Sequence, residues 1–368
     1  MRISSRESHR RGTGQYQLHC RDDASPCVLR SPFISGSVNA GRQVTTHVNK
    51  HLLTARLLAG GVKSFLPVRK KYTGTGGSDS ARYCYGAWLR HAMVIAEAVP
   101  NLRPRIIAEL GPGDSLGLGL AALLSGIERY VALDVLAHTN IEANVKMLSV
   151  LAALFRARAE IPGEDEFPEL YPRVAERRFP VKALTTLGLV PDVGDDRLGA
   201  IRQAIVDSNG AGPAEAAIRY LCPWPTASLE PASIDLVVSQ AVLQDMDHWT
   251  GVDALSTAFE AMSRWLKPGG VMSHQVNLAF PDTQHWNQHW AYDELTWKVI
   301  RGKRPYYVNR VPASEYLRLC ERFGFDLAAV TPVVADGGVP RVKLPRRFRD
   351  LPASDYTTRA VHFIAVKR

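Results

Sequence analysis

Residues 105–117 read Arg-Ile-Ile-Ala-Glu-Leu-Gly-Pro-Gly-Asp-Ser-Leu-Gly. The stretch begins with a short apolar run, which ends in an acid, Glu109, and continues into a glycine-containing turn. The apolar residues 118–124 that follow have the composition of a buried helix. A strand, a glycine turn and a helix in this order form the unit that holds a nucleotide-like ligand at the carboxyl end of a parallel sheet.

The turn carries two glycines, Gly111 and Gly113. Neither has a Cβ atom, so the backbone can turn sharply there and approach a ligand closely. Asp114 or Ser115 is expected to cap the helix that follows. The turn is therefore the expected ligand-binding part of the unit.

The spacing of the glycines distinguishes between two classes of ligand. A dinucleotide fingerprint, G-x-G-x-x-G, requires its third glycine at position 116, where Leu116 stands. Glu109 would also repel a pyrophosphate, whereas it would attract a cation. S-adenosylmethionine carries an ammonium and a sulfonium and no phosphate. The stretch resembles the first motif of class I S-adenosylmethionine-dependent methyltransferases, E/D-x-G-x-G-x-G, with Ser115 in place of the third glycine. An ordinary strand-turn-helix of another α/β protein is the alternative.

The resemblance implies that Glu109, Gly111, Pro112 and Gly113 contact S-adenosyl-L-methionine. A second acid supports this interpretation. Residues 130–135 read as a buried strand that ends at Asp134, about 20 residues after the glycines. A carboxylate at that place can accept hydrogen bonds from both ribose hydroxyls.

Later segments resemble further motifs of the same family. Residues 233–244 predict a central parallel strand, because their apolar run does not alternate. A helix over 252–266 is expected to end at Lys-Pro-Gly-Gly, 267–270, and a fifth strand follows over 271–278. The resemblance adds Ser239 and Gln240 to the expected cofactor contacts.

The carboxyl-terminal third predicts a helix over 312–325 and strands over 326–334 and 359–367. Such an antiparallel pair is what the family adds to its sheet. The expected fold is therefore α/β, a Rossmann-like methyltransferase sheet that is mostly parallel, has a C-terminal antiparallel strand and carries a helical insertion. The resemblance covers about residues 80–368.

The expected domain organisation has two parts. Residues 1–46 are basic, lack a sustained hydrophobic period and are predicted to form a disordered tail, and residues 47–368 form the methyltransferase domain. Near its start we expect a small helix over 48–58 and a helix over 81–98, capped by Ser80.

Two segments depart from a minimal version of this fold. The helical insertion is placed at about 140–220, with helical patterns over 141–156, 196–208 and 213–220 and a third strand near 217–222. An aromatic lid is placed at about 280–310. Trp286 and Trp290 lie four residues apart there, as do His285 and His289. Two histidines on one helical face can bind a metal, but no acid completes a signature, so no metal site is predicted.

Charge and composition limit the expected partners. The net charge is +9, but residues 1–72 hold 13 Lys/Arg and 3 Asp/Glu, so the rest is close to neutral. Nucleic acid is therefore not an expected partner. Basic runs at 298–304 and 341–349 indicate either a solvated surface or contact with an anionic substrate or a membrane surface.

No apolar run is long enough for a transmembrane segment. Five scattered cysteines fit a reducing cytoplasm better than a disulfide framework. The oligomeric state is not indicated.

The candidate catalytic residues follow the fourth strand or lie in the fifth. Methyl transfer to a hydroxyl requires a base with a pKa near neutrality. Asp245, His248 and His274 are the candidates, although His274 inside a strand is more commonly a core residue. Related enzymes often have Glu-His where this chain has Gln244 and Asp245, so no catalytic role is transferred to that position.

The sequence therefore predicts an S-adenosylmethionine-dependent methyltransferase. Residues 81–91, Ala-Arg-Tyr-Cys-Tyr-Gly-Ala-Trp-Leu-Arg-His, together with the stretch 109–117, also resemble a branch of the family associated with bacterial polysaccharide biosynthesis, which implies O-methylation of a glycan or glycan precursor. One alternative is a small-molecule O- or N-methyltransferase of secondary metabolism. Another is a non-catalytic binding module with the same fold.

Overall fold

The computed structural model describes residues 50–66, 76–208, 213, 215–246, 253–281, 283–304 and 307–368. The strands are β1 Ile106–Leu110, β2 Arg129–Leu133, β3 Ile218–Leu221, β4 Ile234–Gln240, β5 Leu266–Asn277, β6 Phe325–Val334 and β7 Thr358–Lys367. The helices are α1 Lys50–Lys63, α2 Ala81–Ala98, α3 Gly117–Leu124, α4 Ile141–Arg156, α5 Val181–Thr186, α6 Asp195–Asp207, α7 Ala254–Trp265, α8 Glu294–Arg301, α9 Ala313–Arg322 and α10 Arg346–Arg349. Short 3-10 helices are η1 Leu243–Asp245, η2 Gln288–Ala291, η3 Arg341–Lys343 and η4 Ala353–Tyr356.

The strands form one seven-stranded sheet in the order β3-β2-β1-β4-β5-β7-β6. Strands β1 to β5 pair in parallel, whereas β7 is antiparallel to both β5 and β6. The expected Rossmann-like sheet with its antiparallel carboxyl-terminal strand is therefore confirmed. The strand order reverses between β1 and β4, which is where open α/β sheets bind ligands at the carboxyl ends of the strands.

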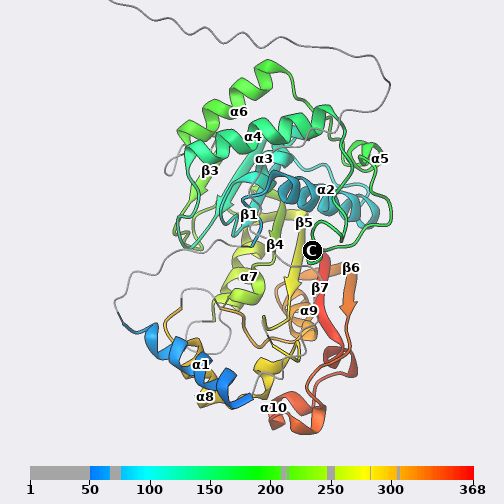
Figure 1. Cartoon of the computed structure of the whole chain (residues 1–368). Helices are drawn as coiled ribbons and strands as arrows, with labels where there is room; N and C mark the ends of the chain where they lie inside the picture. Colours follow the sequence, from blue (N-terminus) through cyan, green and yellow to red (C-terminus); the bar gives the residue numbers. More distant parts are fainter. Residues whose placement is uncertain are drawn as a thin grey trace, which may run out of the picture. The chain divides into compact units, whose positions relative to one another are not determined.

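Helices cover both faces of this sheet (Figure 1). Successive strand side chains point to opposite faces. In β1, Ile107 joins an apolar core with α2, α3 and α4, whereas Ala108 and Leu110 join a second core with α7 and α9. Both cores hold the same sheet, so the ends of β1, β2 and β4 are supported from two sides.

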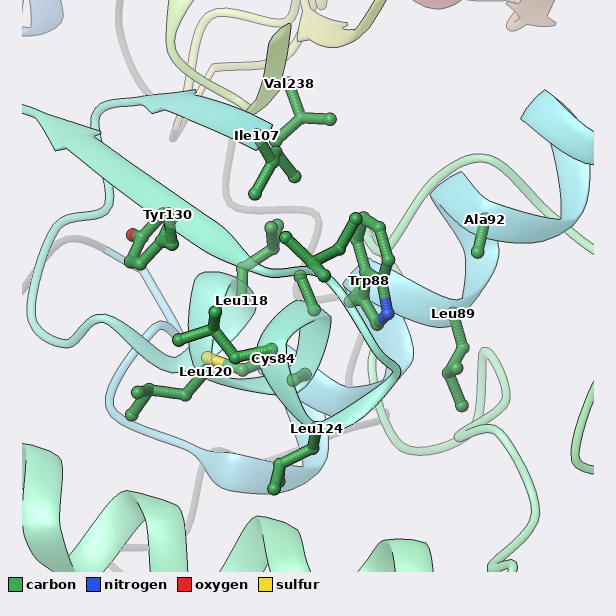
Figure 2. Packing of buried hydrophobic residues seen from close by; sticks show 14 of the residues in the cluster. Cys84, Trp88, Leu89, Ala92, Ile107, Leu118, Leu120, Leu124, Tyr130 and Val238 are labelled. Atoms are coloured by element: carbon green, nitrogen blue, oxygen red, sulfur yellow. The ribbon is translucent and has the colours of Figure 1, made fainter. Parts of the chain in front are cut away.

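The first of these cores joins α2 and α3 to the sheet (Figure 2). Trp88 of α2 is fully buried, and its Nε1–H donates to Ser125 Oγ at 2.7 Å. Two glycines of α3 allow the close packing: a Cβ on Gly117 would lie 2.4 Å from Cys84 Sγ, and one on Gly119 would lie 2.1 Å from the Tyr130 ring. Gly117 therefore serves helix packing.

Most predicted elements occur within a few residues of their expected bounds, including α2, α4 and the third strand. Ser80 caps α2, accepting from the Tyr83 backbone N–H. The helix expected over 213–220 is wrong, because the chain from Ile218 is strand β3, paired with β2. Strand β5 begins earlier than expected, at Leu266, since Leu266 already pairs with Ile234 and a register shift accommodates the residues that follow.

The inserted segment between β2 and β3 contains α4, α5 and α6. It is joined to α2 through a buried cation, Arg90, which is 2% exposed. Its Nη1 donates to Pro172 O at 2.7 Å and its Nη2 to Pro162 O. Backbone carbonyls therefore accept from both terminal nitrogens of this guanidinium, whereas Arg90 Nε has no protein partner.

The aromatic segment expected as a lid packs into the interior instead. Trp290 is fully buried and stacks on Phe348 at 5.3 Å between centroids, and Trp286 belongs to the same core. The segment forms a 3-10 helix, η2, so His285 and His289 do not share an α-helical face. These tryptophans are buried because apolar side chains of β5, α9 and α10 surround them, which local spacing does not reveal.

Contacts group Val48–Arg368 into one compact unit. The tail predicted over residues 1–46 lies outside the described residues. None of the helices that the structure describes combines the length and the apolar character needed to span a bilayer.

Candidate active site

A cavity of about 730 Å³ opens at the carboxyl ends of β1, β2 and β4. Its walls come from the glycine turn, the start of α2, the segment before α2 and the residues that follow β2 and β4. The lining residues are Gly76, Ser78, Tyr83, Cys84, Ala87, Glu109, Gly111, Pro112, Gly113, Leu118, Asp134, Val135, His138, Gln240, Ala241, Val242, Asp245 and Pro281.

The glycine turn has a conformation that requires glycine. Gly111 has φ +64° and Gly113 has φ +73°, both in the left-handed region that side-chain-bearing residues rarely adopt. A Cβ on Gly111 would also lie 2.7 Å from Val242 Cγ2. The Gly111 N–H donates to Leu133 O at 2.8 Å, which ties the turn to the end of β2.

Asp134 lies directly after β2 and is buried at the cavity wall. Its Oδ2 accepts from the Gly113 N–H at 3.2 Å, and its Oδ1 accepts from the N–H groups of Val135, at 2.7 Å, and Leu136. Burial raises the pKa of Asp134, and these backbone donors oppose that shift. The carboxylate is thus held in one orientation beside the glycine turn.

Glu109, at the end of β1, is 4% exposed and lines the same cavity. The Tyr130 hydroxyl donates to its Oε2. Burial raises the pKa of Glu109 to about 8, and the neighbouring charge of Asp134 contributes, while the Tyr130 hydrogen bond opposes the shift. A cation in the cavity would favour the charged carboxylate and offset its desolvation.

Two serines fasten the segment before α2 onto the glycine turn. The Asp114 N–H donates to Ser78 Oγ at 2.8 Å, and Ser115 Oγ donates to Ser78 O. Ser115 Oγ also accepts from the Gly117 N–H at the start of α3. The serine that stands in the family's third glycine position therefore holds a wall of the cavity in place.

Asp245 ends the 3-10 helix η1, five residues after β4, and its side chain lines the cavity. Burial raises its pKa to about 7, although the positive charge of Arg301 opposes the shift. Asp245 also lines a smaller adjoining cavity of about 150 Å³, together with Trp224, Met246 and Arg301. A carboxyl group with this pKa can accept a proton near neutral pH.

The predicted cofactor residues are largely brought together. Glu109, Gly111, Pro112, Gly113, Asp134 and Gln240 all line the main cavity. Ser239 does not line it. Its side chain is fully buried and is hydrogen-bonded to His274 Nδ1 at 2.7 Å.

The structure separates Asp245 and His274, two of the predicted catalytic residues. Asp245 lines the cavity, whereas His274 is fully buried in β5 and lines neither cavity at this end of the sheet. Burial lowers the pKa of His274 to about 3, so it is a poor proton acceptor at neutral pH. This environment assigns His274 to the core. His248 lies outside the described residues.

Several lining residues were not expected from motifs. Ser78 and His138 lie in irregular segments, and Ala241 has φ +55°, a conformation rare for alanine. Such strained positions concentrate at functional sites, but their dihedral angles cannot be read from a sequence. Tyr83 of α2 also lines the cavity.

The cavity is acidic. Its lining, as far as the chain is described, contains Glu109, Asp134 and Asp245 and no lysine or arginine. A pyrophosphate would find no lysine or arginine to pair with there, whereas a cation would find carboxyl groups that can ionise beside it. Among the described residues, no group of three or more His, Cys, Asp or Glu is placed to hold a metal ion.

The sequence matches no protein-family model and no curated protein. Three solved structures have a similar chain path. A methyltransferase from Methanosarcina mazei, described as SAM-dependent, has a TM-score of 0.38 at 13% identity over 74% of this chain and 96% of that one. Geranyl diphosphate C-methyltransferase from Streptomyces coelicolor has a TM-score of 0.37 at 10% sequence identity, over 75% of this chain and 78% of that one. An S-adenosylmethionine-dependent methyltransferase from Mesorhizobium loti has a TM-score of 0.33 at 14% sequence identity, over 74% of this chain and 96% of that one. At these values the likeness is one of chain path alone.

Proposed function

We propose that the chain is an S-adenosylmethionine-dependent methyltransferase and that the main cavity binds the cofactor. The proposal rests on the acidic side chains of the cavity. Three carboxyl groups, from Glu109, Asp134 and Asp245, line it at the point where the strand order reverses, and its described lining has no lysine or arginine. This environment fits a sulfonium ligand and disfavours a dinucleotide.

Two parts of the cavity suit the two ends of such a ligand. Asp134 follows β2 and is oriented by the Gly113 N–H, so it can accept from vicinal ribose hydroxyls. Glu109 and the glycine turn lie at the end of β1, where a carboxylate would stabilise a positive charge. When bound, S-adenosylmethionine supplies a methyl group on an activated leaving thioether, so the protein mainly supplies alignment and excludes water.

Asp245 is the proposed general base. It lines both the main and the adjoining cavity, and its pKa of about 7 permits it to take a proton from a hydroxyl. This supports an O-methyltransferase. The finer assignment, a glycan or glycan precursor as acceptor, rests on the motif resemblance at residues 81–91 and 109–117. A small-molecule acceptor is the alternative.

Calorimetric titration with S-adenosylmethionine and with NAD tests the cofactor assignment. We expect binding of the first alone. Asp134→Ala should weaken it by about 1.5–3 kcal/mol, the range for hydrogen bonds to a charged group. Asp207→Ala is the matched control, because Asp207 is an exposed carboxylate at the end of α6.

Two outcomes would contradict the proposal: a preference for NAD, or unchanged affinity in a folded Asp134→Ala protein. A non-catalytic binding module would bind the cofactor normally and transfer no methyl group to any acceptor. Turnover assays with hydroxylated glycans and small molecules distinguish that case.

A further inference from the structure

Three segments that are distant in the sequence meet at one end of the described fold. Helices α1 and α8 pack together, and the Lys303 N–H donates to Ser64 Oγ at 2.8 Å. Lys303 Nζ also lies 5.4 Å from the centroid of the Phe65 ring. Glu294 of α8 pairs with Arg347 of α10 at 2.7 Å. Helices α1, α8 and α10 therefore lie next to one another at this end of the fold (Figure 1).

This surface exposes large apolar side chains. Leu295 of α8 is 74% exposed and Val342 of η3 is 80% exposed, the latter between Arg341 and Lys343. Three more follow at the end of α1, where Val62, Phe65 and Leu66 are each more than half exposed. Exposed apolar residues that gather in one place mark an interaction surface, whereas scattered ones need no explanation.

The same surface is strongly basic. Residues 341–350 contain five Lys/Arg and one acid, and Lys63, Lys298 and Lys303 are exposed beside the apolar residues. The nearest acid on α8, Glu294, is paired with both Arg310 and Arg347. Asp293 accepts from the Thr296 backbone N–H and hydroxyl as the cap of α8. Positive charge therefore dominates around the apolar side chains.

We propose that this basic–apolar surface, formed by residues 62–66, 294–303 and 341–349, docks the protein onto an anionic lipid bilayer. Basic side chains would lie among lipid headgroups, while Phe65, Leu295 and Val342 would enter the interface between headgroups and acyl chains. A nucleic acid would use the positive charges but would leave the exposed valine and leucine side chains in water. The combination therefore favours a membrane surface over a nucleic acid.

Sedimentation with vesicles tests this surface on the full chain. We expect binding to vesicles of phosphatidylcholine mixed with phosphatidylglycerol, little binding to phosphatidylcholine alone, and release at high salt. A Lys343→Ala, Arg346→Ala protein should partition roughly 25-fold less, since each basic residue near the surface contributes about fivefold. A Leu295→Ser, Val342→Ser protein should also bind more weakly.

Matched controls come from another face of the fold. Lys146→Ala, Arg202→Ala removes two exposed cations, and Val150→Ser, Val206→Ser removes two exposed valines from α4 and α6. Both control proteins should bind like wild type, and the thermal midpoint of every variant shows that it is folded.

The proposal is overturned if wild type does not bind the anionic vesicles. It is equally overturned if the surface variants bind as tightly as wild type, which would assign binding to another basic part of the chain. If wild type binds single-stranded RNA but no vesicles, and the surface variants lose that affinity for RNA, the surface is a nucleic-acid site instead.

Discussion

Burial shifts the pKa values of two sets of side chains in opposite directions: the carboxyl groups of the cavity and a cluster of buried histidines. Burial raises the pKa of Glu109 to about 8 and that of Asp245 to about 7. It lowers the pKa of His91 to about 4 and that of His274 to about 3. Desolvation has the same effect on both groups, because it favours the neutral form of an acid and of a base alike.

The two groups differ in where their hydrogen bonds go. The hydrogen-bond chain through His91 is closed: His91 Nε2 lies 3.0 Å from Gln240 Oε1, which can only accept, so His91 Nδ1 accepts from Ser273 Oγ at 2.7 Å. Ser273 Oγ then accepts from His362 Nε2 at 3.0 Å. The carboxyl groups instead face a cavity that a ligand can fill.

A shifted pKa alone therefore does not identify a catalytic residue. The closed histidine chain holds Gln240, whose Nε2 donates to Tyr171 O at 3.1 Å in the inserted segment. It therefore joins the sheet to the insertion, while the open carboxyl groups remain free for chemistry.

The largest expected effect comes from removing the proposed base. Asp245→Asn should keep cofactor binding and lower turnover by about 10²–10⁴-fold. In wild type, the rate should rise with pH through about 7 as Asp245 loses its proton, and the variant should lack that step. The pH profile of kcat measures both.

His274→Gln is the matched variant from the buried histidines, and its pH profile should keep the step. His248→Ala belongs in the same series, because His248 follows the same strand in the sequence. Wild-type turnover in the Asp245 variant together with loss in the His248 variant would move the base to His248.

The next effect concerns acid stability. His91 resists protonation in the folded state, so the unfolded state binds more protons as the pH falls from about 6.5 to about 4. Stability should therefore decline over that window, by about 2 kcal/mol at pH 5 from His91 alone. Urea unfolding at pH 7 and pH 5 measures the decline.

His91→Gln should make the decline shallower, even if the variant is less stable at pH 7. His285→Gln is the control, because His285 hydrogen-bonds to Gly337 O outside the cluster. An unchanged pH dependence in His91→Gln would show that His91 is not the group responsible.

A third expected effect concerns Glu109. Its folded pKa is raised, so its contribution to stability is present at low pH and is lost as the pH rises toward about 8. Glu109→Gln should therefore gain stability relative to wild type at pH 9, while Tyr130 keeps an acceptor.

The same variant should bind S-adenosylmethionine about tenfold more weakly, which corresponds to roughly 1.4 kcal/mol of lost attraction to a cation. Calorimetry in buffers of different ionisation enthalpy should also show that wild type releases a proton on binding and that Glu109→Gln releases less. Equal affinity and equal proton release would place Glu109 away from the bound cation.

Several parts of the fold follow from the sequence alone. Short-range patterns determined them: an apolar run followed by glycines predicted β1 and its turn, and Ser80 predicted the start of α2. Asp134 was identified because an acid after the second strand must come to the carboxyl edge of the sheet. These features depend on backbone conformation and on neighbours within one unit of structure.

How distant side chains meet depends on the tertiary structure. In the sequence, Ser115 is only a departure from a motif, whereas in the structure its hydroxyl donates to Ser78 O. Trp290 was expected in a lid and lies in the core. His274 was a candidate base and is fully buried in β5. Asp245 acquires its raised pKa from burial by the surrounding fold. Solvent exclusion and hydrogen-bond partners arise from segments far apart in the chain, so no local pattern encodes them.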